Sequence, residues 1–77
     1  MAYRPSWSQR TAISIKKAID RSDKSLNKLA DETAIPLSTL FRRYRGANAW
    51  DTEQIEKVAR ALGLEPDDIL PGGKAAA

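Results

Sequence analysis

The sequence predicts an all-α fold in which four to five short helices pack around one small core. Three observations lead to this prediction. Apolar residues recur at helical spacing in several separate segments, residues that begin or end helices stand between those segments, and no segment shows the period-two alternation of a half-buried strand. The 77 residues are enough for one domain with a single core.

The first helix is expected to begin near Ser6 or Ser8. Ser6 and Gln9 have the spacing of a capping box. The apolar residues that then repeat on one face are Ala12, Ile15, Ala18 and Ile19. Residues 1–7 show no helical period, so they are predicted to form a flexible N-terminal arm. The polar residues 20–25 are predicted to be a short connection.

Two further helices are predicted on either side of Pro36. Ser25 is an acceptable N-cap for the first of them, which must stop before Pro36 because a residue preceding proline is disfavoured in the α region. Pro36 suits the first turn of the next helix, and Gly46 is a natural stop at its end. Residues 25–46 are therefore predicted to form a helix–turn–helix.

The fourth helix has the clearest start in the chain. Asp51 is a good N-cap with Gln54 three residues later, and Trp50 and Ile55 have the spacing of a hydrophobic staple. Gly63 is expected to end this helix. The predicted buried residues are Ile55, Val58, Ala59 and Leu62.

A short fifth helix is predicted after Pro66. Its residues Ile69 and Leu70 are expected to fold back onto the core. The predicted organisation is therefore an arm at residues 1–7, a helix–turn–helix domain at residues 8–70 and a disordered tail at residues 71–77.

Several classes of function are disfavoured by what the chain lacks. It contains no cysteine and no histidine, which removes thiolate chemistry, zinc sites with Cys or His ligands and the usual general base of hydrolases. The adjacent acidic pairs 31–32 and 67–68 point to different sides of a helix. No phosphate loop or nucleophile–base pair is present. We expect no enzyme activity, no catalytic or metal site and no cofactor.

The location expected from the sequence is the cytoplasm. No apolar run approaches the roughly 20 residues of a membrane helix. The first ten residues lack the apolar centre of a signal peptide, and the absence of cysteine fits an intracellular protein.

The charges are distributed unevenly along the chain. Residues 1–46 hold ten of the 13 Lys/Arg residues and four of the ten Asp/Glu residues, whereas residues 47–77 hold three and six. A chain with one basic half can turn that half toward a polyanion such as nucleic acid. The alternative is that these charges form ordinary solvated helix faces.

The third predicted helix carries the polar residues that suit a DNA groove. On a helical wheel at about 100° per residue, one arc is apolar and the opposite strip is polar. The apolar arc holds Leu37, Leu40, Phe41 and Tyr44. The strip holds Ser38, Arg42 and Arg45, flanked by Thr39 and Arg43. Arginine can bond guanine O6 and N7 through two donors, and hydroxyl groups can bond bases or phosphates.

Residues 25–70 resemble the Cro/repressor-type helix–turn–helix family, the lambda-repressor-like DNA-binding domains. The positions that match the family pattern without a gap are Leu29, Ala30, Ile35, Ser38, Leu40, Gly46, Ala59, Leu62 and Gly63. Ile15 and Ala18 extend the match into the first helix. The resemblance implies a compact four- to five-helix domain whose third helix enters the major groove.

The chain departs from the family pattern at four places. Leu26 stands where the family often has a phosphate-contacting Gln. Lys24 replaces an expected apolar residue, and Leu26 is expected to fill the core in its place. Ala34 stands at the turn glycine, which is acceptable if the turn avoids a positive φ. Pro36 and Leu37 replace a small or polar pair. Arg43 occupies a usually apolar position, so either its stem packs while its head reaches solvent or phosphate, or it pairs with an acid.

The expected DNA contacts follow from these positions. Base contacts are expected from Leu37, Ser38 and Arg42, and also from Phe41, which is equally suited to fill the core. Contacts to the DNA backbone are expected from Asn27, Lys28, Thr39, Arg43, Arg45 and Asn48. Tyr3 and Arg4 are a possible minor-groove arm.

The function expected from the resemblance is sequence-specific binding of double-stranded DNA by a small transcriptional repressor. A phage Cro-like protein that occludes its operator fits best, located in the cytoplasm of a bacterial or phage-infected cell. Homodimer contacts are expected from Trp50, Ile69 and Leu70. The alternatives are an antitoxin or anti-repressor that binds a protein through the same fold, and the DNA-binding fragment of a larger repressor.

Overall fold

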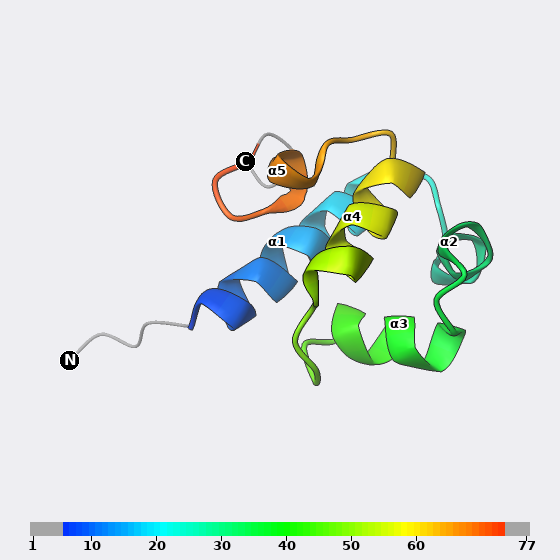
Figure 1. Cartoon of the computed structure of the whole chain (residues 1–77), viewed down its shortest axis with the longest axis horizontal. Helices are drawn as coiled ribbons and strands as arrows, with labels where there is room; N and C mark the ends of the chain where they lie inside the picture. The colour runs from blue at the N-terminus through cyan, green and yellow to red at the C-terminus, as the bar shows by residue number, and fades with distance from the viewer. Residues whose placement is uncertain (1–5, 74–77) are drawn as a thin grey trace.

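The computed structural model of the protein describes residues 6–73. Within this range the chain forms five helices and no strand (Figure 1). The helices are α1 (Trp7–Arg21), α2 (Leu26–Thr33), α3 (Leu37–Tyr44), α4 (Thr52–Ala61) and α5 (Pro66–Ile69). Helix α2 packs on α3 and α4, α1 packs on α3 and α5, and α5 also packs on α4. The prediction of an all-α domain with a helix–turn–helix is confirmed.

The N-terminal ends of the helices follow the predicted capping residues. The backbone N–H of Gln9 donates to Ser6 Oγ at 3.2 Å, and the N–H of Ser6 donates to Gln9 Oε1 at 2.8 Å, which is a complete capping box. Asp51 accepts from the N–H of Gln54 at 2.8 Å. Because α1 begins at Trp7, the last two residues of the predicted arm belong to the first helix and its cap. Residues 1–5 lie outside the described residues.

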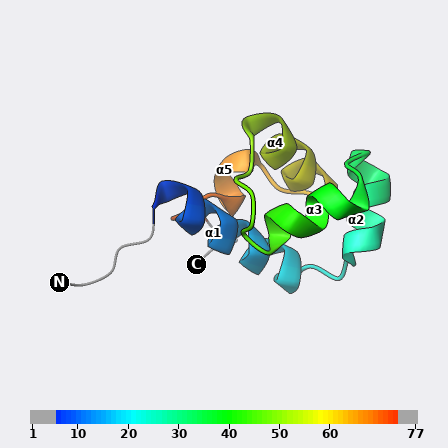
Figure 2. The same ribbon diagram turned by 90° about the horizontal axis from the view of Figure 1, so that it is seen from below.

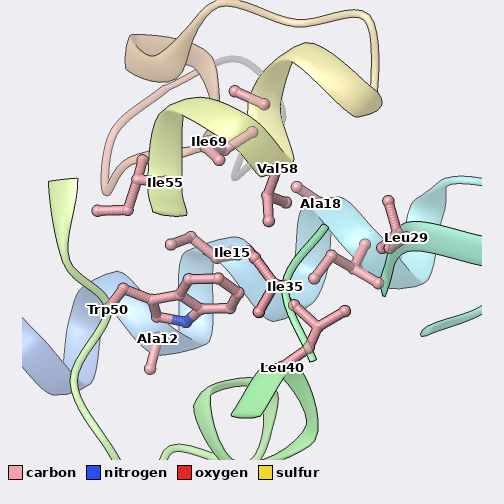
Figure 3. Close-up of a cluster of buried hydrophobic side chains, with 12 residues drawn as sticks. Ala12, Ile15, Ala18, Leu29, Ile35, Leu40, Trp50, Ile55, Val58 and Ile69 are labelled. Atoms are coloured by element: carbon pink, nitrogen blue, oxygen red, sulfur yellow. The ribbon is translucent and has the colours of Figure 1, made fainter. Parts of the chain in front are cut away.

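The core fills the space between α1, the helix–turn–helix and α4 (Figure 3). Ile15, Leu29, Leu40, Val58 and Ile69 have side chains with no exposed surface. The Trp50 side chain points into this core and is 9% exposed. Leu62, the last residue of the predicted buried stripe, comes just after α4 and is partly buried at the edge of the core.

The prediction that Trp50 and Ile69 contact a second copy is wrong. Both side chains are part of the core of one chain: Ile69 has no exposed surface, and Trp50 keeps only 9% of its surface. Leu70 packs against the core from its edge and is partly buried. Of the predicted dimer set, Leu70 is the residue that is not part of the buried core.

The turn between α2 and α3 places an alanine in a left-handed conformation. Ala34 has φ 60° and ψ 19°, so the condition under which alanine replaces the turn glycine without strain is not met. Thr33 supports the turn, because its hydroxyl donates to the Leu29 carbonyl at 2.6 Å and accepts from the N–H of Ile35 at 3.3 Å. An alanine in this region is strained by contact of its Cβ with the backbone, at a cost of about 1–2 kcal/mol.

Helix α5 is attached to the first helix by a buried hydrogen bond. The hydroxyl of Ser14 donates to the carbonyl of Ile69 at 2.7 Å, across 55 residues of sequence. After α5 the chain turns at residues 71–73, and the N–H of Gly73 donates to the Leu70 carbonyl at 2.8 Å. The first three residues of the predicted tail, 71–73, therefore form a turn on α5. Residues 74–77 lie outside the described residues.

Lys24 joins three parts of the fold. Its ammonium group donates to Glu32 Oε1 of α2 at 2.7 Å and to the carbonyl of Ala61 at the end of α4. A cation at a helix C-terminus is favourable because the last carbonyls have no partner within the helix. Leu26 is partly buried against the core, as expected for the apolar residue that compensates for this lysine. Within residues 6–73 no helix is long and apolar enough to cross a membrane.

Candidate nucleic-acid interface

Helix α3 lies across one face of the molecule, where no other helix covers it (Figure 2). Leu40 is its one fully buried residue. Thr39, Arg43 and Tyr44 are partly buried on the same inner side. This arrangement differs from the helical wheel, which grouped Leu37 and Phe41 with Leu40 in one apolar arc and put Thr39 and Arg43 beside the polar strip.

The outer face of α3 combines polar and apolar side chains. Leu37 is 43% exposed and Phe41 is 44% exposed, so the alternative that Phe41 fills the core is wrong. Ser38 and Arg42 are exposed beside them, and Arg45 follows just after the last turn. The guanidinium of Arg45 lies over the Phe41 ring at 5.4 Å from its centroid, which is a cation–π distance. We call these five residues, Leu37, Ser38, Phe41, Arg42 and Arg45, the outer face.

Arg43 binds the loop that follows α3. Its Nη1 donates to the carbonyl of Ala49, while its Nε is buried without a hydrogen-bond partner. It makes no ion pair with an acid within residues 6–73, so neither sequence alternative describes its main contact. Because its guanidinium is held by the protein, Arg43 fixes the loop at Ala49 rather than extending the outer face.

The loop after α3 is also closed by a glycine. Gly46 has φ +83°, the N–H of Gly46 donates to the Arg43 carbonyl at 3.0 Å and the N–H of Ala47 donates to the Arg42 carbonyl at 2.9 Å. These two bonds form a Schellman motif, which needs a left-handed residue at the position of Gly46. Asn48 is exposed in this loop, at the end of α3 that carries Arg45.

The start of α2 offers a second set of polar groups. Ser25 caps the helix by accepting from the N–H of Lys28 at 3.2 Å. Asn27 and Lys28 are exposed in this first turn. A helix N-terminus carries a partial positive charge that favours an anion. Contact of Asn27 and Lys28 with phosphate stays a prediction.

A comparison with protein-family models matches residues 14–71 to the Cro/C1-type HTH DNA-binding domain. The chain belongs to this family. It is a DNA-binding regulator of the helix–turn–helix class. Comparison with curated proteins gave no match, and comparison with solved structures gave none.

The family match of this Cro/C1-type domain covers α2 to α5 and the second half of α1. It therefore includes the whole outer face and the elements that hold it. Tyr3 and Arg4, the predicted minor-groove arm, lie outside both the match and the described residues.

A polar cluster that was not predicted attaches the end of α3 to α1. Tyr44 donates its hydroxyl to Asp20 Oδ1, and Lys16 donates to Asp20 Oδ2 at 3.0 Å. The Lys16 ammonium also lies 5.0 Å from the centroid of the Tyr44 ring. The spacing of Lys16 and Asp20 suggests their ion pair, but no sequence signal connects them to Tyr44.

The cluster shifts the pKa values of its members in the directions that hydrogen bonding requires. The Tyr44 hydroxyl, and then Lys16, hold the pKa of Asp20 below its ordinary value. The hydrogen bond to Asp20 raises the pKa of Tyr44, and burial adds to the rise. The hydrogen bond to Asp20 also raises the pKa of Lys16. At neutral pH all three groups therefore stay in the states that bond α1 to α3.

Proposed function

We propose that this domain is a small sequence-specific transcriptional repressor that occludes its operator, with α3 in the DNA major groove. The observation that carries the proposal is the outer face, where Ser38 and Arg42 are exposed on a helix that no other helix covers. A helix of this kind matches the dimensions of the major groove, and arginine forms two hydrogen bonds with guanine. A phage Cro-like role in the cytoplasm of a bacterial or phage-infected cell fits the family.

The proposed contacts separate into two groups. Leu37, Ser38, Phe41 and Arg42 face the base edges. Contacts with the phosphates are assigned to Asn27, Lys28, Arg45 and Asn48, which are exposed on the flanking helix start and loop. Thr39 and Arg43 are left out of the proposal because their inner positions direct them toward the protein.

Binding as a homodimer to two half-sites is part of the proposal. Dimers of helix–turn–helix proteins bind half-sites whose centres lie about 34–36 Å apart, one turn of DNA. The contact is assigned to the surface around Leu70, which retains accessible surface at the edge of α5. Sedimentation of the protein alone and on DNA tests this part, because a single copy per site would contradict it.

The proposed function is tested by selecting bound sequences from a random DNA pool and measuring affinity for the selected site. Arg42→Ala should lose about 1–3 kcal/mol of binding free energy on that site and less on unrelated duplex. Arg45→Ala should weaken binding to unrelated duplex as well as to the selected site and reduce the salt dependence by about one phosphate contact.

The matched control is Arg60→Ala, because Arg60 is exposed on α4, away from the outer face. Its loss should leave the preference for the selected site unchanged. If the wild-type protein prefers no sequence over random duplex at moderate salt, the repressor proposal is wrong, and a protein partner of an antitoxin-like module becomes the better explanation.

A further inference from the structure

Two large apolar side chains are exposed in the middle of the outer face. Leu37 and Phe41 keep 43% and 44% of their surface accessible, although Leu40 between them is fully buried. Exposed apolar side chains on an otherwise charged surface mark a contact site. Ser38 and Arg42, which follow them directly in sequence, are exposed on the same face.

The charged residues decide what covers this apolar pair. Arg42 and Arg45 border the pair, and no acidic residue lies on α3. This arrangement suits a polyanion that also offers small apolar groups. In the major groove of duplex DNA, the apolar group presented at the base edges is the methyl group at C5 of thymine. 5-Methylcytosine carries its methyl group at the same ring position.

We propose that Leu37 and Phe41 recognise the C5-methyl groups of pyrimidines, next to base pairs that Ser38 and Arg42 bind. The inference rests on the proposed DNA-binding function and specifies what the operator contains. Phe41 adjoins Arg42, and arginine prefers guanine. The operator therefore carries a methylated pyrimidine, thymine or 5-methylcytosine, beside a guanine.

The spacing of the two apolar residues predicts the spacing of the methyl groups. Leu37 and Phe41 are four residues apart, which is about 6 Å along a helix axis at 1.5 Å per residue. Base pairs are spaced about 3.4 Å apart along the DNA axis. When the helix lies along the groove, the two side chains meet methyl groups about two base pairs apart.

Arg45 prepares Phe41 for this contact. Its guanidinium covers one side of the Phe41 ring, so the ring loses less side-chain freedom when it packs against DNA. The same guanidinium lies at the end of α3, where it can reach a phosphate. This contact gives Arg45 a positioning role for Phe41 besides its own contact with the DNA backbone.

The test uses the site selected from the random pool and removes methyl groups without changing base pairing. Each thymine is replaced in turn by deoxyuridine, which lacks only the C5-methyl group. At two positions about two base pairs apart, affinity should fall by about threefold to tenfold, as expected for one buried methyl group. Other thymine positions should change by less than about twofold.

A second arm distinguishes the two sources of the methyl group. At each sensitive position the T·A pair is replaced by C·G and, separately, by 5-methylcytosine·G. If the methyl group itself is recognised, the 5-methylcytosine site should bind about threefold to tenfold more tightly than the cytosine site. Equal binding of the two sites would contradict recognition of 5-methylcytosine and restrict the inference to thymine.

Three variants connect the methyl effect to the side chains. Phe41→Ala and Leu37→Ala should each abolish the deoxyuridine effect at one position, and Phe41→Leu should retain part of it because an apolar contact remains. The matched control is Ile13→Ala, since Ile13 is 50% exposed on α1. Its loss should leave the thymine-to-deoxyuridine affinity ratio unchanged. Circular dichroism checks that each variant is folded.

The inference and the proposed function fail in different ways. If the selected site binds equally well with every thymine replaced by deoxyuridine, the inference is overturned although specific DNA binding stands. If no sequence is selected, the proposed function fails first. A deoxyuridine effect that persists unchanged in both Phe41→Ala and Leu37→Ala also overturns the inference, because other residues would then carry it.

Discussion

Helices α3 and α4 are of similar length and end in the same way, yet they are held in the fold by different means. Both are followed by a glycine of positive φ, Gly46 after α3 and Gly63 after α4. Helix α4 begins at a side-chain cap from Asp51 and buries three residues. Helix α3 follows Pro36, which provides no side-chain cap, and buries only Leu40.

The difference shows how a small domain leaves one helix free for a ligand. Three buried residues hold α4 against the core, whereas α3 is held by the single buried residue Leu40 and by contacts at its two ends. Thr33 supports the turn before it, and Tyr44 and Arg43 attach its last turn to α1 and to the following loop. A helix held at its ends can expose one whole side, and apolar residues on that side are available for binding rather than for folding.

The strongest test of this comparison is a pair of truncations to alanine. Ile55→Ala on α4 removes a side chain that is 6% exposed and should lower the free energy of unfolding by about 2–5 kcal/mol. Leu37→Ala on α3 removes a side chain that is 43% exposed and should change it by about 0.5 kcal/mol. Urea denaturation measures both values. Similar losses in the two variants would mean that α3 contributes to the core as much as α4 does.

A second test addresses the entry into α3. Ala34→Gly should raise the free energy of unfolding by about 1 kcal/mol, because glycine has no Cβ to strain at φ 60°. The matched control is Ala30→Gly inside α2, which should lower it by about 1 kcal/mol. Thermal denaturation gives both signs. A destabilised Ala34→Gly protein would mean that the left-handed turn is not strained.

The smallest change in stability is expected from the cluster of Lys16, Asp20 and Tyr44, which joins the end of α3 to α1. The pKa of Asp20 is lowered in the fold, so its contribution to stability is present above its ordinary value of 3.8 and is lost as the pH falls through the lowered value. The pKa of Tyr44 is raised, so its contribution is present below its ordinary value of 10.0 and is lost as the pH rises above it.

Stability measured against pH tests this assignment. Asp20→Asn should flatten the acid limb of the curve, and Tyr44→Phe should flatten the alkaline limb. The double variant should be less destabilised than the sum of the two single variants, since both remove the same hydrogen bond. Purely additive losses would show that Asp20 and Tyr44 do not interact in solution.

The helix boundaries could be predicted because they depend on local chemistry. Ser6 with Gln9 and Asp51 with Gln54 form their capping bonds within four residues, so the sequence alone contains both partners. Gly46 and Gly63 end their helices for the same local reason. The conformation of Ala34 was not predicted, because alanine gives no signal for a left-handed turn.

The side of α3 that faces outward could not be predicted from its apolar residues. The helical wheel grouped Leu37 and Phe41 with Leu40 and Tyr44 in one apolar arc, whereas the expected base contacts required Leu37 and Phe41 to face outward. The structure exposes both residues. The structure turns Arg43 inward instead because the carbonyl of Ala49 accepts from its guanidinium, and that partner comes from the folded loop. When a binding surface contains apolar residues, the assumption that apolar residues face the core assigns them to the wrong side of the helix.

The assignment of Trp50 and Ile69 to a dimer contact was wrong because both residues belong to the core. The staple spacing of Trp50 and Ile55 already placed the tryptophan against its own helix, and the structure buries it there. Ile69 was likewise expected to fold back onto the core, and the structure buries it completely. Whether an apolar residue lies at the surface or in the core depends on contacts between segments that are distant in the sequence.

The bond from Ser14 to Ile69 has a consequence for synthesis of the protein on the ribosome. A nascent chain that has emerged as far as Leu64 contains the complete helix–turn–helix, but it lacks the helix whose Ile69 fills the core. Because α1 and α5 are joined across 55 residues, the domain can complete its packing only after α5 has been synthesised and has emerged from the ribosome. Until then the apolar residues of α1 remain available to chaperones and proteases.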